Sequence, residues 1–313
     1  MISKIILLIL VNFIGAVTYP IGKLSFAYGH PIFLTGIRML LAGFSLLFFV
    51  FFTDKKTVGR FTKHVVYLLI GLSLCNVFLT NWLQFWALQY TTSGKAIFIF
   101  NMSPFIAAIF SYFIYGERMT VKKLFALIIS FVGFLPVLVS TTYNHVPLKQ
   151  FLFIDIAEAA LFLAAIISVI GWFIMKELLQ TTNCSVVFAN GLSMVLGGIV
   201  FFPVSYLSEG ANWYSLSHAY KISGLLLVLI IANNIINYNA YAYFLKYISP
   251  TLIFLISFTG PLFALFFGWL FLGEKIGISF LVTIIVVGIG LMMYLQEEKR
   301  LQADKTLPLE KVK

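Results

Sequence analysis

The chain has 313 residues, of which 61% are hydrophobic and only 10% are charged. A soluble domain usually has about a quarter charged residues and less than half apolar ones, so a water-soluble fold could not bury this much apolar surface. The net charge of +10 does not indicate nucleic-acid binding, because the cationic residues lie in the short connections between apolar runs. The composition therefore predicts an integral membrane protein whose main partner is the lipid bilayer.

Apolar runs of about 20 residues follow one another along the chain, and an α-helix of this length crosses a hydrocarbon core of about 30 Å. The first run is not followed by a small-residue cleavage site, which favours a membrane helix over a signal peptide. The sequence thus predicts an all-α integral membrane protein with ten transmembrane helices. They are expected near residues 4–27, 31–52, 64–88, 93–115, 121–140, 155–178, 184–207, 221–245, 249–272 and 276–296.

Lys and Arg residues are distributed unevenly between the two sides of this arrangement. Ten spans place both termini on one side of the membrane. Of the 21 Lys and Arg residues, Arg38 lies inside a span, five lie on the opposite side, and all the others lie on the side of the termini. Cytoplasmic loops carry such an excess of cations, so both termini are predicted to be cytoplasmic, in a bacterial inner membrane. The five residues on the opposite side are Lys23, Lys95, Lys149, Lys221 and Lys275.

The two halves of the chain repeat each other. A shift of 157 residues, without a gap, matches the following pairs: Asn76 with Asn233, Leu88 with Leu245, Tyr90 with Tyr247, Pro104 with Pro261, Gly116-Glu117 with Gly273-Glu274, and Gly133 with Gly290. Asn, Pro, Gly and Glu are scarce in membrane helices, so their coincidence in one register indicates a duplicated five-helix unit. Because five is odd, the second copy enters the membrane from the opposite side, as in many secondary transporters.

The repeat divides the chain into four expected segments. The first five-helix repeat covers residues 1–140, an external connecting loop covers 141–154, the second repeat covers 155–296, and a charged cytoplasmic tail covers 297–313.

The residues of this repeat carry a family resemblance. This resemblance rests on Pro104 and Pro261 in the fourth helix of each half, on the Gly-Glu pairs that end this helix, and on Arg38 in the stretch PIFLTGIRMLLAG. The chain resembles the drug/metabolite transporter superfamily, of the type with two EamA-like halves. The resemblance covers essentially the whole chain. It implies a ten-helix transporter, with amino acids, their derivatives, nucleotide-like compounds or drugs as substrates. No Arg matches Arg38 in the second half, so a symmetric role for it is not expected.

The two prolines are expected to shape the transport path. Pro104 and Pro261 each remove a backbone hydrogen bond and clash with the preceding turn, so each is predicted to kink its helix. The kinks can serve gating or line a cavity, and a purely structural packing role is the alternative. We expect the Gly-Glu pairs to be architectural, with Gly closing the helix.

Polar residues gather on the third and eighth spans. On the eighth, Asn233, Asn237 and Tyr241 share one helix face, with Asn234 and Tyr238 on the adjoining stripe. Amides facing lipid would be costly, so this face is predicted to line a substrate-binding cavity. A hydrogen-bond network that only packs helices is the alternative. The third span, its repeat partner, contributes the predicted binding residues Asn76, Asn81, Trp82 and Gln84.

The predicted cavity wall also includes Asn12 and Tyr19 on the first span and Trp172 on the sixth. Glu158, which also lies on the sixth span, is a candidate proton carrier or partner of a cationic substrate. The alternative for Glu158 is a carboxylate at the membrane interface. Arg38 lies near the outer end of its span and is expected to snorkel or to pair with a helix end.

No nucleotide-binding loop, metal-ligand cluster or nucleophile motif is found, so no cofactor, no metal and no enzymatic activity are expected. The sequence predicts a secondary active transporter, a monomer or homodimer, that works by alternating access. Its predicted substrate is an amino acid or an amino-acid-derived compound resembling S-adenosylmethionine, coupled to protons or to an exchanged metabolite. The alternatives are a drug or toxic-metabolite exporter, a lipid-modifying membrane enzyme and a scaffold protein.

Overall fold

The computed structural model describes residues 2–53, 62–91, 93–142, 155–210, 219–272 and 278–306, and its regular elements are helices. The first half contains α1 (Ile2–Ala16), α2 (Thr18–Phe26), α3 (Pro31–Thr53), α4 (Lys63–Leu72), η1 (Ser73–Leu79), α5 (Thr80–Leu88), α6 (Ser93–Phe100), α7 (Ser103–Tyr115) and α8 (Val121–Thr142). The second half contains α10 (Ile156–Thr181), α11 (Val186–Glu209), α12 (Ala219–Leu229), η3 (Ile230–Asn237), α13 (Tyr238–Phe244), α14 (Pro250–Ile256), α15 (Thr259–Leu272) and α16 (Ile278–Thr306). Most of the expected connecting loop and the end of the expected tail lie outside the described residues.

Within the described ranges, 7 helical segments are long and apolar enough to cross a membrane. They are Pro31–Thr53, Lys63–Leu88, Phe98–Tyr115, Ile156–Thr181, Val186–Glu209, Tyr220–Phe244 and Ile278–Leu301. Large apolar side chains on their outer faces are exposed, as expected of a surface in contact with lipid; Phe113 is 78% exposed. The chain is therefore a multi-pass membrane protein. Three of the expected spans are each divided into two shorter helices: α1 with α2, α6 with α7, and α14 with α15.

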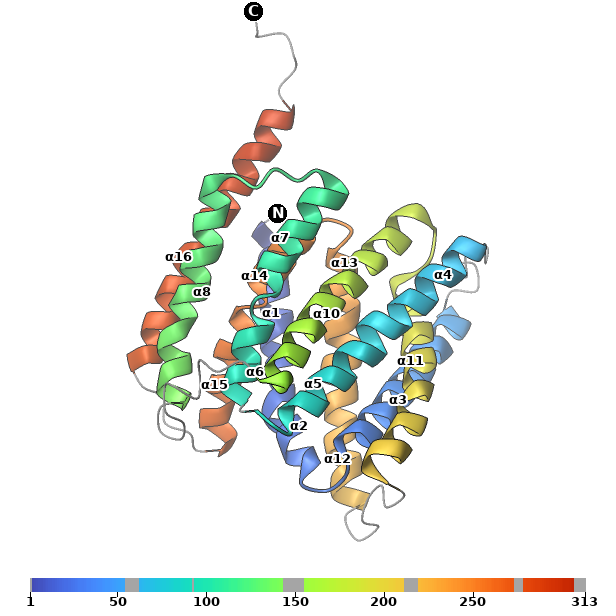
Figure 1. The fold of residues 1–313 in the computed structure, drawn as a ribbon. Coiled ribbons are helices and arrows are strands. Elements are labelled where there is room, and N and C mark those ends of the chain that lie inside the picture. The colour runs from blue at the N-terminus through green and yellow to red at the C-terminus, as the bar shows by residue number, and fades with distance from the viewer. Residues whose placement is uncertain are drawn as a thin grey trace, which may run out of the picture.

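Helices of the two halves pack against each other at both edges of the bundle. α8 lies beside α16 at one edge, and α3 lies beside α11 at the other, with α1, α10 and α13 between them (Figure 1). The α8–α16 contact depends on small residues: a Cβ at Gly290 would lie 2.1 Å from Ser130 Oγ, and one at Gly133 would lie 2.5 Å from Val286. The glycines matched by the repeat thus allow one close helix pair between the halves.

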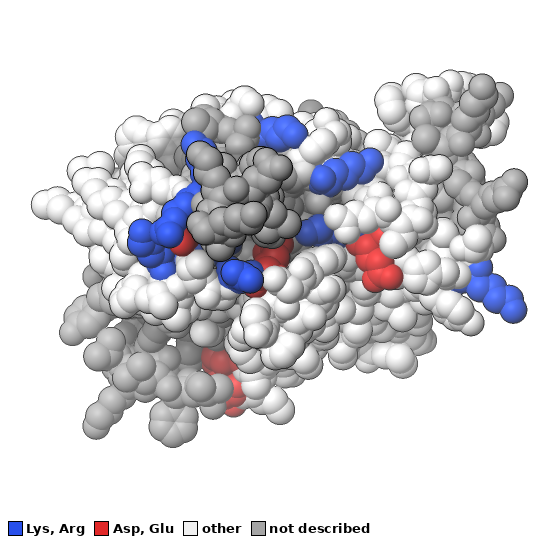
Figure 2. Space-filling view, turned by 90° about the horizontal axis from the view of Figure 1, so that it is seen from above, with Lys and Arg blue, Asp and Glu red and all other residues white. Residues whose placement is uncertain are grey.

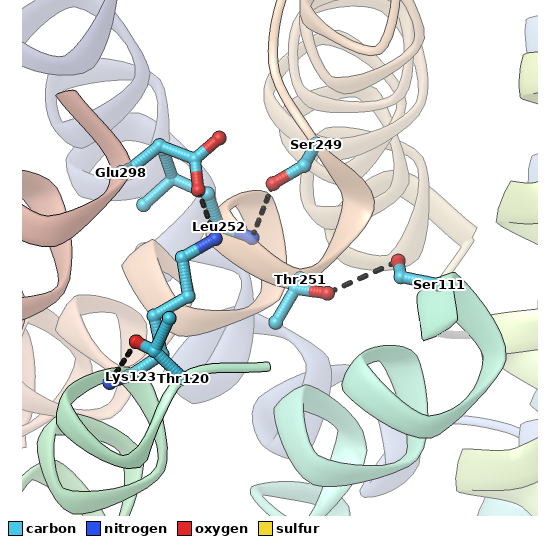
Figure 3. A network of polar contacts seen from close by, with 7 residues as sticks. All are labelled: Ser111, Thr120, Lys123, Ser249, Thr251, Leu252 and Glu298. Atoms are coloured by element: carbon cyan, nitrogen blue, oxygen red, sulfur yellow. Dashed lines mark hydrogen bonds and ion pairs between the residues drawn. The ribbon is translucent and has the colours of Figure 1, made fainter. Parts of the chain in front are cut away.

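Polar contacts join the halves at the end of the bundle where α1 begins and α16 ends (Figure 1). Seen from that end, Lys and Arg side chains are spread over the surface among a few acidic ones (Figure 2). The buried Lys123 of α8 pairs with Glu298 of α16, and Thr251 Oγ1 of α14 donates to Ser111 Oγ of α7 at 3.1 Å (Figure 3). The two halves are therefore held together at this end by buried polar groups.

Candidate functional site

The third and eighth spans each contain a π-helical segment, η1 and η3. A π turn places the backbone N–H five residues after its acceptor: the Thr80 N–H donates to the Cys75 carbonyl, and the Tyr238 N–H donates to the Asn233 carbonyl. Such segments occur mostly as single turns within α-helices, often at functional sites. The shift of 157 residues that relates the halves carries the first residue of η1, Ser73, onto the first residue of η3, Ile230.

Asparagine side chains bond to the carbonyls inside these π segments. Asn81 Nδ2 donates to the Val77 carbonyl at 2.7 Å, and Asn239 Nδ2 donates to the Ile235 carbonyl at 2.8 Å. A buried carbonyl without a partner would be costly, so each amide stabilises the irregular turn beside it. The Nδ2 group of Asn81, a residue predicted to bind substrate, is therefore hydrogen-bonded to the backbone.

The fourth and ninth spans are interrupted just before the two prolines. Pro104 has no N–H to donate to the Phe100 carbonyl, and the Ser103 hydroxyl donates to that carbonyl instead, at 2.6 Å. In the second half, Asn12 Nδ2 of α1 donates to the Ile256 carbonyl and to Thr259 Oγ1, each at 3.0 Å. The structure thus places Asn12 at the break between α14 and α15.

A group of polar and aromatic residues lies between these irregular segments, and we call it the polar–aromatic cluster. It consists of Asn12, Arg38, Asn81, Trp172, Asn234, Asn237, Tyr238 and Tyr241. The Tyr241 hydroxyl donates to Asn12 Oδ1. The Trp172 ring packs near two tyrosines of α13, with its centroid 5.7 Å from the ring centroids of Tyr238 and of Tyr241. The cluster therefore joins α1 of the first half to α10 and α13 of the second.

Tyr238 extends the cluster to α3 and α5. Its hydroxyl lies near the Asn81 side chain, and Arg38 is its charged neighbour. Arg38 is only 7% exposed, and its Nε has no hydrogen-bond partner within the described part of the chain. The expectation that this side chain snorkels or pairs with a helix end is wrong, because α3 turns it into the bundle. Its position seven residues inside an apolar run was the signal that could have revealed this burial.

The amides of η3 complete the cluster. Asn237 Nδ2 donates to Asn233 Oδ1 at 3.3 Å and lies against α1, where a Cβ at Gly15 would approach it to 2.9 Å. Asn234 is fully buried, and its Nδ2 faces the weak acceptor Met39 Sδ at 3.1 Å. Two acceptor atoms of this cluster, Oδ1 of Asn234 and Oδ1 of Asn237, are buried and have no hydrogen-bond partner among the residues that the structure describes.

The remaining residues predicted to bind substrate do not belong to the polar–aromatic cluster. Trp82 is stacked on Phe78, with ring centroids 5.9 Å apart, and packs in the same apolar cluster as Tyr238. Asn76 is buried against α10 at Gly171, and Gln84 on α5 is half-buried. The Tyr19 side chain lies outside the described residues.

The structure does not bring Glu158 to the polar–aromatic cluster. Its Oε2 accepts the Asp155 N–H at 2.7 Å in a capping box at the start of α10, and its Oε1 accepts the Thr91 hydroxyl at 3.0 Å. Trp172 lies fourteen residues further along α10, a separation of about 21 Å along a helix axis at 1.5 Å per residue. Sequence reasoning missed a different contact, in which the buried Asn190 donates to Asn239 Oδ1 at 3.0 Å.

Comparison with known proteins identifies the family. The model of the EamA-like transporter family matches the chain twice, at residues 2–139 and 155–296. The chain belongs to the EamA-like transporter family. The resemblance to drug/metabolite transporters is thereby confirmed, and it covers both halves.

Relatives of this EamA-like protein include transporters with and without a named substrate. A Chlamydia muridarum protein named as an S-adenosylmethionine/S-adenosylhomocysteine transporter is 33% identical over 293 residues, which cover 93% of this chain and 91% of that protein. A Chlamydia trachomatis protein of the same name is 31% identical over 93% of this chain and 89% of its own. The uncharacterized transporter YoaV of Bacillus subtilis is 24% identical over 94% of this chain and 97% of its own.

The fold of this EamA-like protein also matches a solved crystal structure. The two superpose with a TM-score of 0.78 over 96% of this chain and 99% of the other, at 13% sequence identity. At that identity the match shows the shared fold alone. Among the described residues, no group of His, Cys, Asp and Glu could hold a metal ion.

Proposed function

We propose that this EamA-like protein is a secondary active transporter that moves an S-adenosylmethionine-like, amino-acid-derived metabolite across the bacterial inner membrane. The observation that carries the proposal is the polar–aromatic cluster, whose residues are buried or half-buried inside a membrane bundle and come from both halves. Intramembrane polar groups are costly and typically mark substrate pathways. The Chlamydia relatives that are named for this substrate class support the choice of substrate.

The side chains of the cluster suit a molecule with one planar part and one strongly polar part. The rings of Trp172, Tyr238 and Tyr241 form an aromatic wall on which a purine can stack. The Oδ1 atoms of Asn234 and Asn237, which have no partner among the described residues, add hydrogen-bonding groups beside that wall. An adenosyl group joined to an amino-acid group has both parts.

The transporter works by alternating access between two inverted five-helix repeats, residues 1–140 and 155–296, in a ten-helix membrane domain. The double family match, the two π segments and the paired breaks before Pro104 and Pro261 support this organisation. With both termini cytoplasmic, the loop at 141–154 is external. A reporter fused at residue 146 should therefore report an external position, and a cytoplasmic signal there would contradict the topology.

One pair of half-helices suggests which side of the transporter is closed. α7 packs against α14 near the end that holds the termini, where Thr251 bonds Ser111. The repeat relates this pair to α6 and α15, and the described residues of those two helices make no comparable contact. We infer that the conformation is closed on the cytoplasmic side, and that the Pro104 and Pro261 breaks bend when the closed side changes.

Transport by the purified protein tests the proposal. Proteoliposomes loaded with unlabelled S-adenosylhomocysteine should accumulate labelled S-adenosylmethionine by exchange, and a pH gradient in place of internal substrate tests proton coupling. Trp172→Leu should reduce this uptake severely, whereas Trp269→Leu, which removes a 47% exposed indole on α15, should not. Uptake of cationic aromatic drugs without uptake of either nucleoside would instead identify a drug or toxic-metabolite exporter.

A further inference from the structure

Arg38 is a buried cation without a counter-charge in the described part of the chain. It is 7% exposed, its Nε has no hydrogen-bond partner, and no described carboxylate forms an ion pair with it. The carboxylate of Glu209 is occupied elsewhere: it accepts the N–H groups of Ile32 and Phe33 at 2.9 and 3.1 Å, at the start of α3. Packing alone does not account for a guanidinium in this position.

The energetic cost of this arrangement is high. An ion buried without a partner costs several kcal/mol even after the protein relaxes. The backbone of α3 gives no compensation, because Arg38 lies about 10 Å from the helix N-terminus, whose partial charge is itself positive. A charge kept under these conditions is expected to have a ligand as its partner.

The unpartnered atoms around Arg38 define the chemistry of that ligand. The Oδ1 atoms of Asn234 and Asn237 are buried acceptors that lack donors. Both residues lie within one helical turn of Tyr238, whose phenol is a neighbour of the Arg38 guanidinium, and Asn234 also contacts Met39, the residue next to Arg38 in the chain. Arg38 lies on α3 and the two acceptors lie on η3, a segment that packs against α3. One unmatched cation and two unmatched acceptors on neighbouring segments are complementary to an anion and an ammonium group, which is the pair found in an amino-acid zwitterion.

We propose that Arg38 binds the carboxylate of the amino-acid group of the transported molecule, while Asn234 and Asn237 accept hydrogen bonds from its ammonium group. This inference rests on the proposed function and assigns the polar end of its substrate. The planar end then lies against Trp172, Tyr238 and Tyr241. A guanidinium can donate two parallel hydrogen bonds to a carboxylate, which a lysine ammonium cannot reproduce.

Binding of two matched probes to the purified protein tests the proposal. The probes are S-adenosylhomocysteine and its decarboxylated analogue, which keeps the adenosyl, thioether and amine groups. Arg38→Met should bind S-adenosylhomocysteine at least 30-fold more weakly than the wild type does. Its affinity for the decarboxylated analogue should change less than threefold, because that ligand has no group for Arg38 to bind. The affinity of Arg38→Lys for S-adenosylhomocysteine should lie between the affinities of the wild type and of Arg38→Met.

Stability of the empty protein provides a second readout. Replacing an unpaired buried charge by an apolar side chain of similar size should leave the melting temperature unchanged or raise it. The control is Lys176→Met, which removes another buried cation; Lys176 lies 4.1 Å from the centroid of the Tyr115 ring. Lys176→Met should lower the melting temperature and leave the ratio of the two probe affinities unchanged.

The outcomes separate this inference from the proposed function. If Arg38→Met binds both probes more weakly by the same factor, or binds both as tightly as the wild type, the carboxylate site is overturned. The proposed transport of a nucleoside is not affected by either result. If the wild type binds neither nucleoside, the proposed substrate is wrong, and the stability readout still decides about Arg38. A marked loss of stability in Arg38→Met then shows a structural cation and overturns the inference, whereas an unchanged or higher melting temperature supports an anion site.

Discussion

Replacement of Tyr241 by Phe tests whether the contact between α13 and α1 stabilises the bundle. The change removes the hydroxyl that donates to Asn12 Oδ1 and leaves the Tyr241 ring against Trp172. Asn12 is 5% exposed, so water cannot readily replace the lost donor. A buried acceptor without a partner costs about 1–3 kcal/mol, whereas interhelical hydrogen bonds in membranes average about 0.6 kcal/mol. We expect the free energy of unfolding to fall by about 1–2 kcal/mol.

The neighbouring Tyr243 supplies a matched control. Tyr243 is 48% exposed, and its hydroxyl bonds only the Tyr247 hydroxyl, at 3.4 Å, so Tyr243→Phe should cost less than about 0.5 kcal/mol. Reversible unfolding of both variants in mixed micelles, followed by tryptophan fluorescence, measures the difference. Equal unfolding free energies for the two variants would refute the view that the Tyr241–Asn12 bond stabilises the bundle.

Three further substitutions and one control variant test the packing, the proposed movements and the role of Glu158. Gly171→Ala should destabilise the protein by about 1–3 kcal/mol, because the added Cβ would lie 2.7 Å from Asn76. In the control Gly224→Ala the added Cβ meets nothing within 4 Å, so this variant should be slightly more stable than the wild type. Thermal unfolding of both variants measures the difference. Pro104→Ala should restore an N–H donor to the fourth span and lower turnover more than substrate affinity; equal loss of both would favour a packing role. Glu158→Gln keeps the capping geometry, since Gln also completes a capping box, so folded yield and ligand affinity should match wild type, and lost affinity would contradict this. Loss of accumulation driven by a pH gradient in this variant would identify Glu158 as the proton carrier.

Several features of the fold were predictable because they depend on local sequence. Runs of apolar residues long enough to span a bilayer predicted a helical membrane protein, and the matched Pro, Gly and Asn residues predicted a family that the EamA-like match then confirmed. The close α8–α16 contact follows from Gly133 and Gly290, whose absent side chains are visible in the sequence. The capping role of Gly116, which ends α7 with φ 61°, was equally predictable.

The assignment of partners to the buried polar residues required the tertiary structure. Successive residues of an α-helix differ by about 100° in direction, and the sequence places each helix in depth only to within about a turn. It therefore could not show that Glu158 accepts a hydrogen bond from Thr91, between α5 and α6, or that Arg38 turns inward. Nor could it show that Tyr241 reaches Asn12 from 229 residues away. The sequence by itself determined the lipid environment, the helical class and the family, because hydropathy and repeated residues are properties of the chain. Tertiary packing decided which polar groups meet and which remain unmatched, because that depends on the rotation and depth of each helix against its neighbours.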